Sequence, residues 1–251
     1  MDANETRAII ITGGGTGMGR AIAQAFARLG DQVVILGRRE DVLRDTAEAL
    51  GPTVSWQRAD VSRREDVESA VSAVVARHHQ INVLVNAAGF ANGVNAHTPL
   101  AEAERRWDDT VGANLKGAFL MSIAVAPHLA RPGGRILNIS SIAAYTGGSR
   151  GNSIEYAAAK AGMHGLTMGL ARDLSGQGIT VNVIAPGFIT ETEFTSGWSE
   201  ERVRQIVAQT PAGRPGKPDD IAAAAVFLAS SGASFINGEV LNVNGGWLFG
   251  R

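Results

Sequence analysis

Tyr156 and Lys160 are the residues best suited to acid–base chemistry, and they stand four positions apart. Both fall in the run 154–174, whose pattern predicts the longest helix of the chain, and residues four apart share one helix face. A phenol ordinarily has a pKa of about 10. A neighbouring ammonium favours the phenolate, so we expect the pair to exchange a proton nearer neutral pH. Because Tyr and Lys are common residues, the pair alone is a weak signal of catalysis.

Three segments of small and polar residues stand directly after apolar, strand-like runs. In an open parallel sheet, ligands bind beyond the carboxyl ends of the strands, so these segments predict one redox site. The hydroxyl of Ser141 can donate to a carbonyl oxygen or accept from an alcohol, and Thr190 can hydrogen-bond a carboxamide. The segments are Asn86-Ala87-Ala88-Gly89, Asn138-Ile139-Ser140-Ser141 and Pro186-Gly187-Phe188-Ile189-Thr190.

A glycine-rich loop stands between the first apolar run, residues 8–12, and a helical pattern at residues 20–29. Glycines let the backbone turn sharply and approach a pyrophosphate, and a helix N-terminus offers free N–H groups and a partial positive charge. The pattern is T-G-x-x-x-G-x-G and not strict G-x-G-x-x-G. It predicts a dinucleotide phosphate site, against the alternative of a glycine turn without a ligand. The loop reads Thr12-Gly13-Gly14-Gly15-Thr16-Gly17-Met18-Gly19.

The residues after the second predicted strand indicate which nicotinamide cofactor fits. An NAD-binding chain is expected to carry Asp or Glu there for the ribose hydroxyls, whereas this chain has Gly37-Arg38-Arg39. Arginine binds a 2′-phosphate through two hydrogen bonds, and no carboxylate at 37–39 would repel that phosphate. We therefore favour NADP(H), with Arg38 as the main contact and Arg39 as a second contact or a solvated helix-start charge. NAD(H) stays the alternative, because Thr16 lacks a further basic side chain.

The elements that must position these residues alternate between short apolar runs and amphipathic stretches, which predicts a parallel sheet with crossover helices. We expect an α/β fold, a Rossmann-type doubly wound parallel sheet of seven strands flanked by helices, with residues 1–251 as one domain. The predicted strands are residues 8–12, 32–36, 54–59, 81–86, 135–139, 180–185 and 240–243. The predicted helices are residues 20–29, 40–50, 65–78, 114–130, 154–174 and 218–229.

One long segment, residues 187–212, fits no regular element apart from a helical stretch at 200–208. A segment of this kind in a compact domain is often a lid, and we expect a substrate lid here. Phe194 and Trp198 lie in it and can either cover an apolar substrate or pack the lid down. The glycine-rich stretch 146–153 should border the same pocket.

Together these motifs resemble the short-chain dehydrogenase/reductase family in its single-domain form, over residues 12–246, and most of all members similar to 3-oxoacyl-(acyl carrier protein) reductase. The resemblance implies that Tyr156 is the acid/base, that Lys160 binds the nicotinamide ribose and lowers the Tyr156 pKa, and that Ser141 orients the substrate carbonyl. It implies that Asn114 completes the catalytic tetrad by holding a water between Lys160 and solvent. It also implies hydride transfer between the cofactor and a small carbonyl or secondary alcohol, and a homotetramer.

The resemblance adds further residues to the expected cofactor site, with Asp60 and Val61 placed at the adenine ring. The residues expected to bind the cofactor are Gly13, Gly15, Thr16, Gly17, Met18, Gly19, Arg38, Arg39, Asp60, Val61, Asn86, Ala87, Gly89, Tyr156, Lys160, Pro186, Gly187, Ile189 and Thr190.

Some assignments leave an alternative open. Ser141 stands 15 residues before Tyr156, slightly more than in many relatives, and Ser153 is the alternative hydroxyl. We favour Ser141, because Ser153 falls where the helix should be capped. All five histidines are expected to be structural or at the surface, and His97 is the one whose position leaves pocket lining open as an alternative. Gln177 and Pro132 stand where basic residues would help to dock an acidic carrier protein, so we discount that substrate and leave sugar, steroid and small-ketone substrates open.

Composition excludes several other classes. The formal net charge of −1 argues against nucleic-acid binding, and the absence of cysteine excludes thiolate zinc sites and disulfides. The histidines show no metal spacing. No apolar run is long enough to span a membrane and no leader is recognisable, so we expect a cytoplasmic protein. A cofactor-binding sensor without turnover is the alternative from another class, and the presence of both Tyr156 and Lys160 disfavours it.

Overall fold

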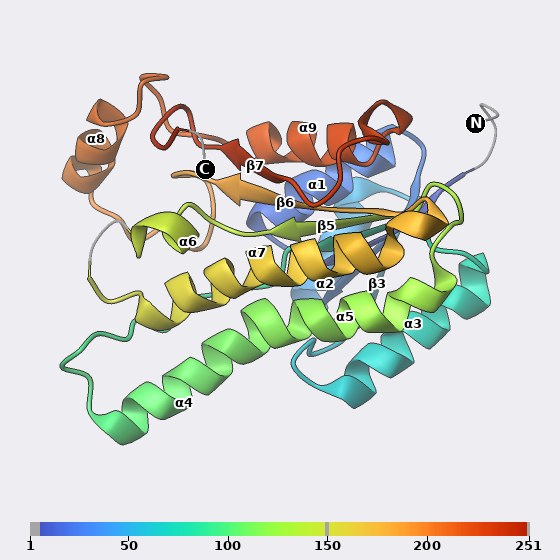
Figure 1. Ribbon diagram of the computed structural model, residues 1–251, viewed down its shortest axis with the longest axis horizontal. Coiled ribbons are helices and arrows are strands. Elements are labelled where there is room, and N and C mark those ends of the chain that lie inside the picture. The colour runs from blue at the N-terminus through green and yellow to red at the C-terminus, as the bar shows by residue number, and fades with distance from the viewer. Residues whose placement is uncertain (1–5, 149–150, 250–251) are drawn as a thin grey trace.

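The computed structural model describes residues 6–148 and 151–249. Its centre is a seven-stranded parallel sheet in the order β3-β2-β1-β4-β5-β6-β7 (Figure 1). The chain builds one half of the sheet outward from β1 and the other half outward from β4, so the topology reverses between these two strands. The strands are β1 Ala8–Thr12, β2 Gln32–Gly37, β3 Val54–Arg58, β4 Val83–Asn86, β5 Arg135–Ile139, β6 Thr180–Pro186 and β7 Val240–Val243.

Helices cover both faces of this sheet, which explains why central strands such as β1 and β4 are nearly continuous apolar runs. Successive side chains of a strand point to opposite faces. In β1, Ile9 and Ile11 pack with α1, α2 and α9, whereas Ile10 packs with α3, α5 and α7. The first layer contains α1 Gly17–Arg28, α2 Glu40–Leu50 and α9 Pro218–Leu228, and the second contains α3 Arg64–His78, α5 Gly117–Val125 and α7 Ile154–Leu174.

The remaining elements lie around the carboxyl ends of the strands and at the helix ends. Helix α4 Leu100–Val111 leads into α5 through a π-helical turn at Gly112–Lys116 and lies beside α7 (Figure 1). The short helices α6 Ala143–Thr146 and α8 Glu200–Ala208 follow β5 and β6. Short 3-10 turns span Ala126–His128, Ser175–Gln177 and Ser231–Ala233.

A buried polar ladder ties the strand ends together at the point where the topology reverses. The Thr12 hydroxyl accepts hydrogen bonds from the backbone N–H groups of Ala87 and Ala88, both at 3.1 Å. The Asn86 side-chain amide donates to Asn138 Oδ1 at 2.8 Å, and Asn138 in turn donates to the Thr167 hydroxyl of α7 at 2.8 Å. These bonds fix the ends of β1, β4 and β5 relative to the helix that carries Tyr156.

The predicted fold class is confirmed, and the boundaries of the predicted strands hold to within two residues. The prediction was wrong between residues 100 and 130, where it missed α4 and expected one helix over 114–130. Helix α4 buries only Thr110, whereas Leu100 and Trp107 are exposed, so its sequence lacks an apolar stripe. The helix expected at 114–130 is the continuation of α4, beginning in the π-helical turn and ending at His128.

Candidate active site

A cavity of about 1030 Å³ runs along the carboxyl ends of the strands, from the glycine loop to the segment after β6. It brings together most of the residues that the sequence singled out. Two of them lie outside it: Asn86 is buried beneath in the polar ladder, and the Thr190 hydroxyl donates to the Gly216 carbonyl oxygen at 3.2 Å. The expected residues that line the cavity are Gly13, Gly15, Thr16, Gly17, Met18, Gly19, Arg38, Arg39, Asp60, Val61, Ala87, Gly89, Asn114, Ser141, Tyr156, Lys160, Pro186, Gly187 and Ile189.

The glycine loop at one end of the cavity is too tight for side chains. Gly13 has a φ of +67°, and a Cβ on it would lie 2.8 Å from the Ala88 Cα. A Cβ on Gly19 would lie 2.2 Å from the Gly13 carbonyl oxygen. Thr16, which precedes α1, makes no side-chain cap to the first turn of the helix. The loop thus presents bare backbone and a helix N-terminus to the cavity, a surface suited to phosphate oxygens.

Two arginines and an aspartate lie where the adenosine half of a dinucleotide would fit. The Arg38 guanidinium lies over the Phe90 ring, 5.3 Å from its centroid. Burial alone would raise the pKa of Asp60, but hydrogen bonds from Ser62 and the positive charge of Arg38 outweigh it, so the pKa lies below its usual value. Arg39 instead pairs with Glu193 at 2.9 Å, and both side chains are more than half exposed.

Tyr156 and Lys160 project from the same face of α7, and Lys160 Nζ lies 5.5 Å from the centre of the Tyr156 ring. Burial raises the Tyr156 pKa to about 12, which a hydrogen bond with Ser141 only partly offsets. Burial also lowers the Lys160 pKa to about 7, and Nζ donates to the Ile139 carbonyl oxygen at 2.8 Å. The expectation that the ammonium pulls the Tyr156 pKa towards neutrality is therefore wrong, because desolvation disfavours both charged forms.

Asn114 lies in the π-helical turn and is fully buried. Its amide donates to the carbonyl oxygens of Phe90 at 2.8 Å and Thr110 at 2.9 Å, whereas Oδ1 has no partner among the described residues. A Cβ on Gly89 would lie 2.2 Å from this oxygen and 3.4 Å from Lys160 Nζ. The glycine therefore leaves a buried acceptor facing the space beside Lys160, where a water or a ligand hydroxyl can donate to it.

The two hydroxyl candidates differ in their contacts. Ser141 Oγ accepts from the Ala143 N–H at 3.1 Å and interacts with the Tyr156 phenol. Ser153 occupies the N-cap position of α7, as expected, but its side chain makes no capping bond. Both residues line the cavity, and Ser141 is the one that forms a hydrogen bond with the Tyr156 phenol.

The segment after β6 covers the cavity with aromatic side chains. The Phe194 ring lies 5.6 Å from the Tyr156 ring, so it covers the candidate proton donor. Trp198 stacks on Phe188 at 5.1 Å with an interplanar angle of 14°, and the Arg202 guanidinium lies 3.4 Å from the indole centroid on Trp198. One aromatic of this segment thus covers Tyr156, and the other packs within the segment. Sequence reasoning gave Phe188 no aromatic role and missed Arg202, because both contact Trp198 only in the folded segment.

His97 is exposed and does not line the cavity, in agreement with a surface position. The expectation drawn from Pro132 and Gln177 was wrong. Pro132 and Gln177 precede β5 and β6, at the amino ends of the strands, so they lie at the opposite edge of the sheet from the cavity. Their types therefore carry no information on carrier-protein docking beside this site.

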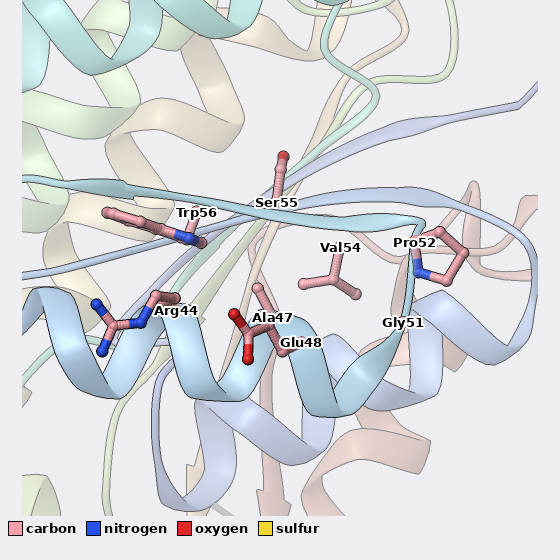
Figure 2. A pocket seen from close by; sticks show the side chains of 8 residues that line it. All are labelled: Arg44, Ala47, Glu48, Gly51, Pro52, Val54, Ser55 and Trp56. Carbon is pink, nitrogen blue, oxygen red and sulfur yellow. The ribbon is translucent and has the colours of Figure 1, made fainter.

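A second hollow, of about 560 Å³, lies between α2 and the edge strand β3 (Figure 2). Arg44, Glu48 and Trp56 line it, and it receives no strand end from the middle of the sheet. The larger cavity is therefore the candidate site.

The described residues hold no group of three or more His, Asp or Glu placed for a metal ion. In the same ranges, no helix is both long and apolar enough to cross a bilayer.

Comparisons with known proteins agree with this geometry. The sequence model of a family described as enoyl-(acyl carrier protein) reductase matches residues 13–248. The chain is 36% identical to 3-oxoacyl-(acyl-carrier-protein) reductase FabG of Vibrio cholerae, over 96% of this chain and 97% of that protein. It is 37% identical to FabG of Escherichia coli, with the same shares covered. The chain belongs to the short-chain dehydrogenase/reductase family.

A solved structure supports the same assignment. The short-chain dehydrogenase/reductase of Brucella melitensis, titled a glucose/ribitol dehydrogenase, superposes with a TM-score of 0.90 and 34% identity, over 98% of each chain. The chain described here is thus an oxidoreductase of this family, and it is similar to proteins named as 3-oxoacyl-(acyl-carrier-protein) reductases. The relatives carry different substrate names, so family membership leaves the substrate open.

Proposed function

We propose that the chain is an NADP(H)-dependent carbonyl reductase or alcohol dehydrogenase with Tyr156 as its acid/base. The observation that carries the proposal is one continuous cavity that joins the glycine loop, Arg38 and the Tyr156–Lys160 pair. The loop supplies a phosphate cradle, and the paired residues supply a proton site in the same cavity. Residues 187–212 act as the lid of this cavity within one catalytic domain.

The residues that would hold the cofactor fit its chemistry. Bare backbone at Gly13 to Gly19 suits the pyrophosphate, Asp60 and Val61 border the adenine region, and Arg38 suits a 2′-phosphate. Glu193 lines the same region and pairs with Arg39, so the phosphate preference rests on Arg38. When bound, the reduced nicotinamide supplies a hydride to the carbonyl carbon.

Tyr156 completes the reduction by moving a proton. Its raised pKa keeps the phenol protonated at neutral pH, so it donates that proton to the carbonyl oxygen as the hydride reaches carbon, and a secondary alcohol forms. Ser141, which contacts the phenol, holds the carbonyl oxygen within reach. Lys160 has the lower pKa and lies next to the ring, so its ammonium returns a proton to the phenolate. The free Oδ1 of Asn114 accepts from the water that reconnects Lys160 to solvent.

The substrate is a small carbonyl compound or secondary alcohol with an apolar portion. Phe194 over Tyr156 and the Phe188–Trp198 stack provide an apolar cover beside the proton donor. The relatives named as 3-oxoacyl reductases make 3-oxoacyl thioesters a leading group, and the Brucella structure makes polyols and sugars another.

The test compares Tyr156→Phe with the native chain in NADPH and NADH oxidation against ketones, 3-oxoacyl thioesters and ketoses. We expect turnover with NADPH to fall about 10²–10⁴-fold in the variant while the NADPH dissociation constant stays within about twofold. The chain has two tyrosines, so Tyr145→Phe, which removes the other phenol outside the cavity lining, is the matched control. Tight cofactor binding without turnover of any substrate by the native chain would favour the sensor alternative.

A further inference from the structure

Glu155 is a buried carboxylate beside the proposed proton donor, and the reaction does not use it. It stands in the first turn of α7 with 0% of its surface exposed. Oε1 accepts the N–H groups of Asn92 at 3.1 Å and Gly93 at 2.9 Å, and Oε2 accepts that of Val94 at 3.1 Å. Within the described ranges it forms no ion pair. Its charge is therefore stabilised by three loop amides and the positive end of α7.

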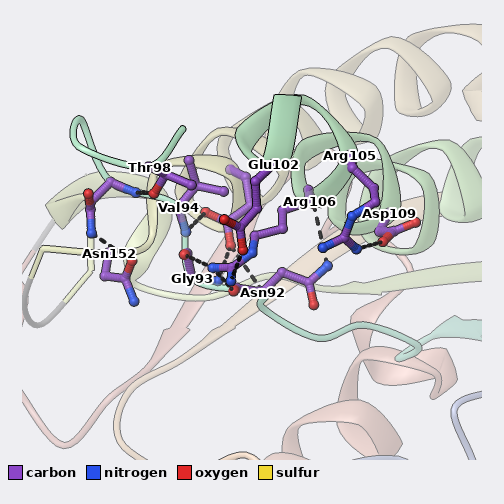
Figure 3. A network of polar contacts seen from close by, with 11 residues as sticks. Asn92, Gly93, Val94, Thr98, Glu102, Arg105, Arg106, Asp109 and Asn152 are labelled. Carbon is purple, nitrogen blue, oxygen red and sulfur yellow. Dashed lines mark hydrogen bonds and ion pairs between the residues drawn. The ribbon is translucent and has the colours of Figure 1, made fainter. Parts of the chain in front are cut away.

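The same loop is held from its other side by a positive charge. Arg106 of α4 donates to the carbonyl oxygens of Asn92 at 3.1 Å and Gly93 at 2.7 Å, and it also pairs with Glu102 (Figure 3). The amide side of the segment thus faces a carboxylate from α7, and the carbonyl side faces a guanidinium from α4. Because hydrogen bonds to charged groups are stronger than neutral ones, the two helices together fix this segment.

The segment held in this way forms part of the cavity wall. Asn92 and Gly93 line the cavity, and Gly93 has a φ of +77°. A Cβ on Gly93 would lie 2.7 Å from Asn152 Nδ2, so the glycine allows the wall to touch the segment before α7. Asn95 Nδ2 donates to Asn152 Oδ1 at 3.1 Å and closes the same contact. Two loops therefore meet at the mouth of the cavity on the Tyr156 side.

We propose that Glu155 is a positioning residue that sets the substrate wall at residues 92–94 relative to Tyr156. One turn of α7 carries both the proton donor and the anchor of the wall, so the distance between the substrate and the phenol is fixed by consecutive residues. Loss of the anchor weakens substrate binding and leaves cofactor binding and proton transfer in place. The proposal rests on the proposed function, because it assumes a carbonyl substrate reduced at Tyr156.

The test uses Glu155→Gln in the full chain. The glutamine side chain has nearly the shape of glutamate, but its NH2 group replaces one of the two carboxylate oxygens. That NH2 group then faces a backbone N–H of the loop, and two donors form no hydrogen bond. We expect KM for the carbonyl substrate to rise about tenfold while kcat and the NADPH dissociation constant change less than about threefold. The kcat–pH profile should not move. Hydrogen exchange of the amides of residues 92–94, followed by mass spectrometry, should speed up at least about tenfold.

Two further variants and a control keep the result interpretable. Glu155→Asp keeps the charge and should restore part of the substrate affinity. Arg106→Lys keeps the positive charge but loses the second hydrogen bond to the wall, so it should raise KM in the same way even if Glu155→Gln does not fold. Glu104→Gln removes an equal charge from the exposed side of α4 and should leave every reading unchanged.

The outcomes separate this proposal from the proposed function. If amide hydrogen exchange at residues 92–94 is the same in Glu155→Gln as in the native chain, the anchoring role is overturned, whatever the turnover of the variant. Faster exchange with an unchanged substrate KM, or an equal rise in substrate KM and cofactor dissociation constant, overturns the positioning role. If the native chain reduces no carbonyl compound, the proposed function fails and the substrate role of Glu155 fails with it, while the exchange result still decides the anchoring.

Discussion

At the scale of single residues, burial governs the chemistry more than the pairing of charges does. Tyr156 and Lys160 were recognisable from their spacing, but the direction of their pKa shifts was not. The spacing of two residues on a helix says nothing about how much solvent the folded chain removes from them. The role of Glu155 could not be recognised from the sequence either. It depends on the loop amides of residues 92–94, which only the folded chain places beside this carboxylate.

The buried Lys160 should make stability depend on pH. Its pKa falls from 10.5 to about 7 on folding, so between these values the unfolded chain binds more protons than the folded one. Stability should therefore rise with pH from about 7 to about 10, by on the order of 1–3 kcal/mol, and Lys160 should add no further pH dependence below 7. Urea unfolding at pH 7 and pH 9.5 should show the rise in the native chain and not in Lys160→Met. An equal rise in both proteins would contradict the low pKa.

Arg38 should decide between the two nicotinamide cofactors. Arg38→Ala removes a fixed charge and two hydrogen-bond donors from the 2′-phosphate, so the dissociation constant of NADPH should rise about 10–100-fold and that of NADH about twofold at most. Arg39→Ala is the matched comparison and should have the smaller effect, because Arg39 pairs with Glu193. Cofactor fluorescence titration measures both constants. Equal losses for NADPH and NADH would remove the argument for NADP(H).

At the scale of elements, the sheet was predictable and the connections were less so. Strands such as β1 and β4 are fully buried on both faces, and their nearly continuous apolar runs reveal them. Helix α4 has no such run, because it buries only Thr110 and keeps Leu100 exposed. The π-helical turn that carries Asn114 also has no sequence signature. Residues 187–212 were recognisable as an irregular segment, but the stack of Phe188, Trp198 and Arg202 within it depends on how the segment folds.

Gly13 joins two elements, and its replacement tests that junction. In Gly13→Ala the new Cβ would meet the Ala88 backbone at 2.8 Å with φ at +67°, so the ends of β1 and β4 must separate. We expect a loss of about 1–3 kcal/mol in the free energy of unfolding and an NADPH dissociation constant raised more than about tenfold. Urea denaturation and cofactor titration measure these. Gly176→Ala, at a position with open space and no positive φ, should be neutral. If Gly13→Ala bound NADPH with the dissociation constant of the native chain, the role of the glycine loop as a phosphate site would be contradicted.

At the scale of the whole molecule, several exposed apolar side chains lie on the adjoining helices α4, α5 and α7, although Leu29 and Phe227 in the other layer are exposed as well. Helices α4, α5 and α7 expose Trp107, Phe119, Ile123 and Met168, each by more than 40%. Surfaces of this kind in soluble proteins commonly mark interfaces between chains. We propose that they bury against further copies of the chain in a homotetramer, as the family resemblance implies.

The assembly can be tested on α5, where Phe119 and Ile123 stand four residues apart. The double variant Phe119→Asp with Ile123→Asp places two charges on the exposed face, and burying them in an interface is unfavourable. We expect sedimentation to show tetramers for the native chain and smaller species for the variant, with unchanged far-UV circular dichroism. Leu29→Asp, in the other layer, is the control and should keep the native size. A monomeric native chain would refute the assembly.

The stack of Trp198 on Phe188 also gives the molecule an optical probe. The chain has four tryptophans, and two of them, Trp198 and Trp247, line the cavity. Indole emission depends on the groups in contact with the ring, and the Arg202 guanidinium lies 3.4 Å from the Trp198 centroid. A ligand that enters the cavity and displaces Trp198 is therefore expected to alter the ultraviolet emission of the unlabelled protein. Its binding can be followed in real time by stopped-flow fluorescence, with no dye attached and before any substrate is identified.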